Sequence, residues 1–390
     1  MSAFFKAMIY ALVLKIRHLF YDLGWIKSVP TELPSVCVGN VGVGGTGKTP
    51  MTELIIKTIQ EGEVESADAE IYGFEGSLFA VQQKSVAVVS RGYKRSTKGF
   101  QVVSTKGTAS QFGDEPMQIK RKFPDVAVVV DEDRNEAADF LAHPSKLKEL
   151  EQKKLDKILY PRVSRPDIIV LDDAFQHRKT KASKSIVLTT YSRPYFKDHL
   201  LPWGRLRDLR SRADAADMIV VTKCPPYIDE WEKAQWAQKM GVSQYDVNTC
   251  SGKTKDGRDK KVLFATTVYD KLTPVFKEGD PRYIHSKLAI LVTGIADDTP
   301  FAGRLGETYK LVGHKQFGDH HNFSDADIHQ INAMAVHTPT AIVITTEKDA
   351  MRFMDKDVPD VLKFRMFYAP IRTQMLTAGE QTALKEFLNF

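Results

Sequence analysis

The stretch "VCVGNVGVGGTGKTPMTELI", residues 36–55, indicates which class of structure this chain forms. A short apolar run leads into a glycine-rich loop, and an amphipathic segment follows. Residues 42–49 spell G-x4-G-K-T, the pattern of a phosphate-binding loop between a strand and a helix. Its glycines let backbone N–H groups converge on phosphate oxygens, and the dipole of the next helix adds to the attraction. The candidate nucleotide-binding residues are Gly42, Gly44, Gly45, Thr46, Gly47, Lys48 and Thr49.

Two side chains of this loop and a pair of acids predict a magnesium–nucleoside triphosphate site. Lys48 supplies positive charge to β- and γ-phosphate oxygens, and the Thr49 hydroxyl is a ligand for Mg²⁺. A protein of this class also needs an acid at the end of another strand to hold the metal, directly or through water. "IIVLDD", residues 168–173, provides Asp172 and Asp173 after four apolar residues. Either acid can be the one nearest the metal.

The rest of the chain alternates short β-branched runs with helical segments. This alternation predicts an α/β fold, a P-loop NTPase-like and mostly parallel sheet with helices on both faces. The runs expected as strands are residues 34–40, 85–90, 125–131, 168–173, 185–191 and 217–225. A second alternation follows in residues 288–297, 339–353 and 364–371. Helices are expected at residues 50–63, 132–143, 146–159 and 227–240.

The length of 390 residues favours two domains or one large domain with additions. The alternation of strand-like and helical segments becomes irregular near residue 270, which indicates a domain boundary. We expect an N-terminal helix at 1–30, a P-loop core at 31–270, a linker or hinge at 271–286 and a smaller α/β domain at 287–390. Residues 60–84 are acidic and weakly periodic, and we interpret them as an insertion.

Composition limits the partners. The net charge of +6 suits an anionic ligand or a membrane surface but is too small to indicate nucleic acid. Nothing in the sequence indicates an obligate protein partner. Three widely spaced cysteines predict neither a disulfide framework nor a metal site, which favours a reducing compartment.

The first 25 residues place apolar side chains at spacings of three and four, the stripe of an amphipathic helix. Their longest uncharged run has eight residues, from Ala7 to Leu14, too few to cross a bilayer core of roughly 30 Å. No small-residue cleavage site follows, which argues against a signal peptide. Taken alone, the stretch leaves two interpretations open: a helix packed on the core, or a basic helix lying in a membrane interface.

Several further clusters are candidates for the chemistry. "FGDEP" offers Asp114 and Glu115 as acceptors of a proton from an attacking hydroxyl, although an aspartate there is more often a helix cap. "FGDHHNFS" holds His320 and His321 after an acid, which is either an acid–histidine pair or a capping loop.

Arginines are candidates for binding phosphate or another anion. Arg91 in "SRGY" and Arg134 in "DEDR" are candidates for contact with the transferred phosphate, or else solvated surface arginines. "LPWGRLRDLRSR" gathers further arginines that either bind an anionic ligand or begin a charged helix; these are Arg205, Arg207, Arg210 and Arg212.

Together these motifs resemble one family, the lipid A 4'-kinases (tetraacyldisaccharide 4'-kinases) of Gram-negative outer-membrane synthesis. The resemblance covers nearly the whole chain, from about residue 20 to 370. It is carried by "VGNVGVGGTGKTPMTE", "SRGYKRSTKGF", "FGDEPMQI", "VVVDEDRNEA", "IIVLDDAFQHR", "LLPWGRLRDL", "ADMIVVTK", "FGDHHNFS" and "ITTEKDAMRF".

The resemblance implies a monotopic inner-membrane enzyme that uses MgATP at the cytoplasmic face. Its substrate would be a tetraacylated glucosamine disaccharide 1-phosphate, phosphorylated on the 4'-hydroxyl. In the family, an acid of the GDEP motif and a histidine activate that hydroxyl; they correspond here to Asp114 and, most directly, His320, so with Lys48 these are the expected catalytic residues. Gln176 falls on a motif position expected to line the site. The family's N-terminal helix docks on the membrane, which favours the interfacial interpretation.

This sequence departs from the family pattern at three places. Asp208, which we count with Arg207 among the substrate candidates, stands where the family usually has glutamate. Gly318 replaces a common proline, and the insertion at residues 60–84 has no counterpart in the pattern. Two other functions remain as alternatives: a membrane-associated P-loop switch or motor, and a soluble small-molecule kinase. The switch would need a guanine-reading N-K-x-D motif, which "TKCP" and "TEKD" only approximate.

Overall fold

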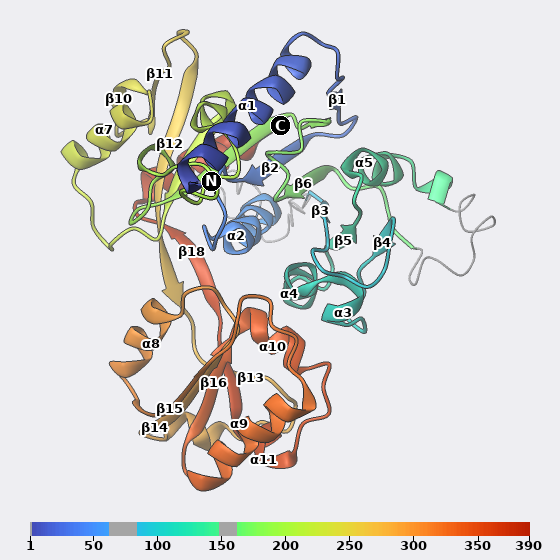
Figure 1. Cartoon of the computed structure of the whole chain (residues 1–390). Helices are drawn as coiled ribbons and strands as arrows, with labels where there is room; N and C mark the ends of the chain where they lie inside the picture. The colour runs from blue at the N-terminus through green and yellow to red at the C-terminus, as the bar shows by residue number, and fades with distance from the viewer. Residues whose placement is uncertain (1, 62–83, 148–161) are drawn as a thin grey trace, which may run out of the picture.

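The computed structural model describes residues 2–61, 84–147 and 162–390. These residues form two sheets, one above the other in Figure 1, and a helix that lies at the edge of the upper part. The expected insertion and most of the helix expected at 146–159 lie outside the described residues.

The first sheet is built around the glycine loop. It has a continuous path of ten strands whose seven central members run parallel. In order across the sheet these strands are β10 (Ser243–Asp246), β11 (Ser251–Lys253), β12 (Asp259–Tyr269), β9 (Met218–Thr222), β8 (Lys184–Thr190), β2 (Ser35–Gly39), β6 (Ile168–Asp172), β3 (Val86–Ser90), β5 (Ala127–Val130) and β4 (Gln101–Val102). A separate pair joins β1 (Val29–Pro30) to β7 (Thr180–Lys181).

Helices cover both faces of this sheet because its central strands are apolar on both sides. Every residue of β2, β3, β6 and β9 is buried. Val36 and Val38 pack on one face with α2 (Lys48–Gln60), α4 (Asp114–Lys122) and α12 (Ala378–Leu388). On the other face Cys37 packs with α5 (Arg134–Ala142), and neighbouring strands pack with α7 (Glu230–Lys239). The predicted mostly parallel α/β architecture is confirmed.

The second sheet has the order β13-β17-β16-β14-β15 and four parallel strands. Its strands are β13 (Thr273–Pro274), β14 (Leu288–Thr293), β15 (Lys310–Gln316), β16 (Ile342–Thr346) and β17 (Met366–Ala369). The helices associated with it are α8 (Thr299–Gly306), α9 (Asp325–His337), α10 (Glu347–Phe353) and α11 (Asp360–Arg365).

Two chain segments link the sheets. The long strand β12 leads out of the first sheet, and β18 (Ile371–Met375) returns antiparallel to it (Figure 1). Residues 371–388 therefore join the first sheet, although the expected boundary assigned them to the smaller domain. The reason is burial: Met375, Leu384 and Leu388 complete the core around α2.

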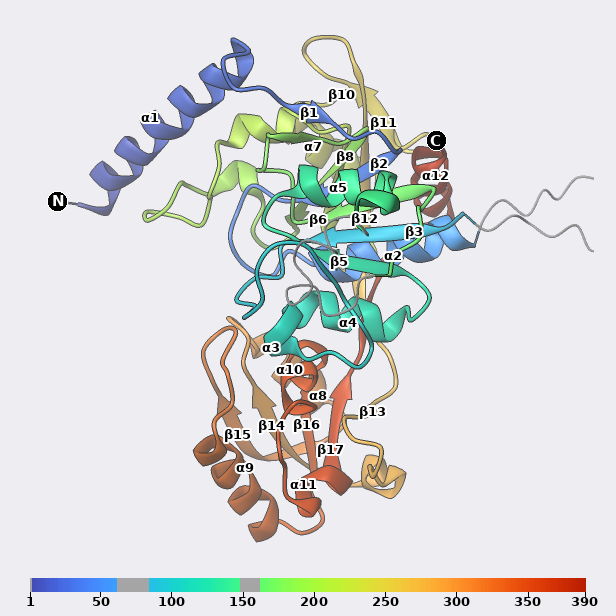
Figure 2. The same cartoon turned by 90° about the vertical axis from the view of Figure 1, so that its right-hand side faces the viewer.

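Helix α1 (Ala3–Asp22) lies on the outside of the first sheet's part of the molecule (Figure 2). Ser2 caps it by accepting a hydrogen bond from the Phe5 N–H, 3.3 Å away. Only three of its residues, Ala7, Leu14 and His18, are buried. No helix in the described part of the chain is long and apolar enough to span a membrane.

Candidate active site

The glycine loop joins β2 to α2, as the sequence predicts. Gly44 and Gly47 have φ angles of 106° and 82°, a left-handed backbone that side chains rarely adopt. The loop is held from outside by a hydrogen bond from the Val43 N–H to the Arg205 carbonyl, 2.8 Å. Lys48 and Thr49 occupy the first turn of α2, where N–H groups have no helical partners and the dipole attracts anions.

The two predicted metal acids lie beside this loop. Asp172 ends β6, which pairs with β2 so that Val38 and Asp172 are partners. The Thr52 hydroxyl donates to Asp172 across 3.1 Å. Lys48 Nζ lies 3.8 Å from an Asp173 oxygen. The phosphate loop and the strand-end acids therefore form one site.

The acids carry a surplus of negative charge. Burial raises the pKa of Asp172, and the nearby Glu115 and Asp173 raise it further. Asp173 is half-buried, and its partial burial would raise its pKa, but Lys48 and Arg207 outweigh this and lower the pKa. Two carboxylates beside a hydroxyl fit a divalent cation, for which Thr49, Asp172 and Asp173 would be the donors.

Such a cation does not need protein side chains as all of its ligands. Among the residues that the structure describes, no group of three or more histidine, cysteine, aspartate or glutamate side chains is arranged to hold a metal. Mg²⁺ usually takes one or two carboxylates and completes its shell with water and phosphate oxygens. The donor set therefore suits magnesium bound together with a nucleotide.

A second group of side chains is brought together from both sheets. Asp114 begins α4, and His320 lies in the loop after β15, with a φ of 57°. Nδ1 of His320 is 3.0 Å from Asp114 Oδ2, and Arg352 of α10 pairs with the same oxygen. The other candidate, His321, instead contacts Asp327 at 2.9 Å.

The charge of Asp114 follows from these partners. Burial by itself would raise its pKa, but hydrogen bonds from His320 and Arg352 outweigh the burial and hold the pKa below its usual range. Asp114 is therefore ionised at neutral pH. Its neighbour Glu115 raises the pKa of Asp172. Helix α4, which begins with Asp114, also contacts the helix that follows the glycine loop, because Gln118 donates to Glu53 of α2 across 2.8 Å.

Other predicted residues surround the strand-end acids. The Arg134 side chain donates to the Asp173 carbonyl across 3.3 Å. Arg207 pairs with the Asp173 carboxylate. Gln176 donates to the Asn40 carbonyl across 2.5 Å. Arg91 follows β3 with an exposed side chain.

Asp208 has a different position from the one we expected. It is buried, and its Oδ1 lies 2.6 Å from Nε2 of His18, a residue of α1. Asp208 therefore attaches the first helix to the core, and nothing in its contacts directs it to phosphate.

Sequence reasoning missed three residues of the site. Asn40 accepts a hydrogen bond from Arg207 at 3.0 Å and donates to Thr46 at 2.8 Å, so it connects the loop to the basic segment. Lys348 and Arg352 of α10 contact the acid–histidine pair. Their spacing of four residues within "EKDAMR" was the available signal, because it places two cations on one face of a helix.

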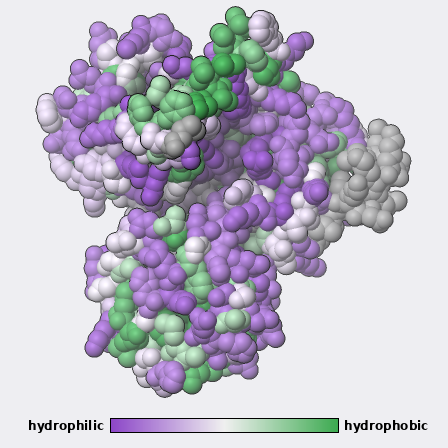
Figure 3. Space-filling model, in the orientation of Figure 1, coloured by the Kyte–Doolittle hydropathy of each residue, from purple (hydrophilic) through white to green (hydrophobic). Residues whose placement is uncertain are grey.

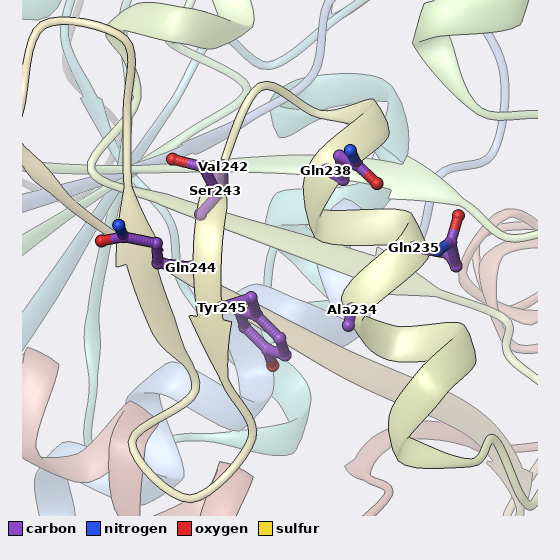
Figure 4. Close-up of a pocket in the computed structure, with 7 residues that line it drawn as sticks. All are labelled: Ala234, Gln235, Gln238, Val242, Ser243, Gln244 and Tyr245. Carbon is purple, nitrogen blue, oxygen red and sulfur yellow. The ribbon is translucent and has the colours of Figure 1, made fainter.

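The cavity in Figure 4 is a separate feature. It holds about 210 Å³ between α7 and β10 and is lined by Ala234, Gln235, Gln238, Val242, Ser243, Gln244 and Tyr245. None of these residues belongs to the site, and all of them are uncharged. The charged groups around the glycine loop are therefore the better indication of function.

Fold and site together define the class: an α/β enzyme in which a glycine loop, a lysine and strand-end acids are arranged for a nucleotide-dependent kinase. A family model described as tetraacyldisaccharide-1-P 4'-kinase matches residues 5–67 and 77–389. The chain belongs to this family, whose kinases act in lipid A biosynthesis. The unmatched residues 68–76 fall within the expected insertion.

Individual proteins agree with this assignment. A tetraacyldisaccharide 4'-kinase of Porphyromonas gingivalis is 33% identical over 97% of this chain and 94% of its own length. The enzyme of the same name from Flavobacterium johnsoniae is 34% identical over 95% of this chain and 91% of its own. Among solved structures, LpxK from Aquifex aeolicus in complex with ATP has a similar fold, with a TM-score of 0.62 at 23% identity over 98% of this chain and 96% of its own.

Proposed function

We propose that this kinase transfers the γ-phosphate of MgATP to the 4'-hydroxyl of a tetraacylated glucosamine disaccharide 1-phosphate at the cytoplasmic face of the inner membrane. The observation that carries the proposal is the meeting of two groups of side chains. The Lys48–Asp173 contact lies at the phosphate loop, and Asp114, which contacts His320, begins helix α4, which packs on α2 after that loop through Gln118 and Glu53. The first group would bind the phosphate donor, and the second would activate the hydroxyl of the acceptor.

The nucleotide end of the reaction uses the first group. Backbone N–H groups of the loop and Lys48 hold the triphosphate, and Mg²⁺ held by Thr49 and the acids Asp172 and Asp173 would neutralise charge on the phosphates. Arg134 and Arg207 lie beside Asp173 and add positive charge. Phosphoryl transfer depends mainly on such positioning and charge neutralisation.

The acceptor end uses Asp114 as general base and His320 as the group that orients it. A sugar hydroxyl is a poor nucleophile at neutral pH, so an in-line base assists the attack. The hydroxyl oxygen forms a bond to the γ-phosphorus, the bond from that phosphorus to the bridging oxygen breaks, and ADP leaves. The hydroxyl proton passes to the Asp114 carboxylate.

Helix α1 would hold the enzyme on the bilayer, where its lipid substrate lies. Its exposed face carries large apolar side chains that form a green band on the surface in Figure 3; they are Phe4, Phe5, Met8, Ile9, Leu12, Val13, Ile16 and Leu19. Lys6, Lys15 and Arg17 add positive charge. An amphipathic, basic helix with this pattern binds at the interface of an anionic membrane.

The test follows label from γ-labelled ATP into a tetraacyl disaccharide 1-phosphate. We expect label in the lipid, and Asp114→Asn should lower turnover by about 10²-fold while ATP still binds. Near-normal turnover in this variant would remove Asp114 from the role of base. Label released only as inorganic phosphate, independently of lipid, would instead favour the nucleotide-hydrolysing alternative.

A further inference from the structure

Helix α10 presents two cations to the Asp114–His320 pair. Lys348 and Arg352 are four residues apart, so they project from the same side of the helix. Lys348 Nζ lies 3.1 Å from His320 Nε2 and 3.1 Å from Glu115 Oε1. Arg352 pairs with Asp114. We call Lys348 and Arg352 the cationic clamp.

The clamp is held firmly in place. Thr346 caps α10 by accepting from the Asp349 N–H, and the Asp349 carboxylate accepts from the Gly294 N–H at 2.8 Å. The same buried carboxylate accepts from Arg352 Nη1 at 2.7 Å. Both strands that carry these groups, β14 and β16, lie in the centre of the second sheet. The position of Arg352 therefore depends on buried contacts, and Lys348 is carried by the same capped helix.

The clamp determines which nitrogen of His320 carries the proton. A lysine ammonium group can only donate, so Nε2 of His320 must accept from Lys348. The ring proton is then on Nδ1, which donates to Asp114 Oδ2. The other neutral tautomer would place an N–H against the ammonium group and an unprotonated Nδ1 against a carboxylate, with only a 3.5 Å contact from Arg352 in return.

We propose that Lys348 is a positioning residue that keeps His320 neutral and protonated on Nδ1, so that the hydroxyl proton goes to Asp114 and not to the imidazole. The inference rests on the proposed roles of Asp114 and His320. Lys348 acts through His320 and has no required contact with the reacting atoms. Glu115 holds the ammonium group in place through its 3.1 Å contact.

The charged groups around His320 determine the direction in which removal of Lys348 should change the charge of its imidazole. Asp114 from α4 faces Nδ1, and Arg352 from α10 lies near it. Asp319, in the same loop as His320, has an oxygen 3.9 Å from Nε2, where Lys348 opposes it. The ring of Tyr93 makes an edge contact at 5.2 Å. Without Lys348 the imidazole lies between two carboxylates, which favours its charged form.

The test compares Lys348→Met with the wild-type enzyme in the transfer of phosphate from ATP to the tetraacyl disaccharide 1-phosphate. We expect kcat to fall by about tenfold and the acidic limb of the kcat/KM profile to move to higher pH by about one unit. The dissociation constant for ATP should stay within about twofold, because no contact links Lys348 to the phosphate loop. Lys348→Arg keeps the positive charge, so the acidic limb of its kcat/KM profile should lie at the wild-type pH. Lys310→Met, which removes an exposed lysine of the same sheet, is the matched control.

A direct measurement of the tautomer completes the test. Nitrogen NMR of histidine-labelled protein, with His320 assigned from His320→Asn, should show the proton on Nδ1 in the wild type. A proton on Nε2 would overturn the inference even if Lys348→Met fails to fold. An unchanged acidic limb in a folded Lys348→Met protein would also overturn it. Normal turnover in Asp114→Asn would instead refute the proposed base, so the two failures are distinguishable.

Discussion

Replacing two apolar residues on the exposed face of α1 should release the protein from membranes without unfolding it. Leu12 is 58% exposed and Ile16 is 45% exposed, one helical turn apart. Complete burial of such a side chain is worth about 2 kcal/mol, so burying the exposed half in a bilayer contributes about 1 kcal/mol. Leu12→Gln with Ile16→Gln therefore removes about 2 kcal/mol, which lowers vesicle binding about 30-fold.

The fold should tolerate this double change. Both side chains already face solvent, and substitutions at such surface positions usually alter the free energy of unfolding by less than about 0.5 kcal/mol. Val336→Gln on α9 is the matched control, because Val336 is 53% exposed and lies on the second sheet's part of the chain. It removes one exposed apolar side chain, with a smaller surface than Leu12 and Ile16 together, from a place that the proposal leaves in water.

Sedimentation with vesicles that contain anionic phospholipid measures the effect, at one fixed ionic strength because the basic residues of α1 also contribute. The melting temperature of each variant is recorded in parallel. Binding of the double variant within twofold of the wild type would refute the interfacial role of α1. An equal loss in the Val336 control would attribute the binding to general hydrophobicity.

Three further results follow from single contacts. Lys48→Met should lower turnover at least 10²-fold, measured as kcat with saturating lipid, because it removes the charge beside Asp173 that the triphosphate needs. Asp208→Ala leaves the buried imidazole of His18 without its partner, and calorimetry should show a loss of about 1–3 kcal/mol of stability. Burial raises the pKa of Asp131 to about 6, so the ionised form destabilises the fold and wild-type stability falls between about pH 4 and pH 6. Asp131→Asn should therefore raise the free energy of unfolding by on the order of 2 kcal/mol at pH 8 and hardly change it at pH 4; an equal gain at both pH values would contradict this.

The first sheet was predictable because its strands are short, β-branched and apolar on both faces. That pattern requires a parallel sheet with helices on both sides, and β2, β3, β6, β8 and β9 all follow it. The assignment of β18 to the first sheet was not predictable. "IRTQM" is an alternating edge strand, and such a pattern states that one face is buried but not which sheet buries it.

The residues of the site also fall into two groups, those that the sequence predicted and those that it did not. Lys48 and Asp172 were predicted because each belongs to a short sequence motif at a place where a strand ends or a helix begins. The partner of Asp208 was not found, because its contact with His18 joins residues 190 positions apart. The clamp residues were missed for a related reason: each is an ordinary helical cation until the second sheet brings it against Asp114. The four-residue spacing of Lys348 and Arg352 shows that they share a helix face, but it does not show which acid that face meets.

These long-range contacts tie the first helix to the phosphate site. The Tyr10 hydroxyl donates to the Arg207 carbonyl at 2.7 Å, and Arg17 donates to the Gln176 carbonyl at 3.1 Å. Arg207 in turn pairs with Asp173, the acid in contact with Lys48. The segments that hold α1 are thus the same segments that surround the strand-end acids. With α1 in its proposed place at the membrane surface, this docking would set the distance of the acids from the bilayer, so a change in it should alter turnover on a lipid acceptor more than ATP binding.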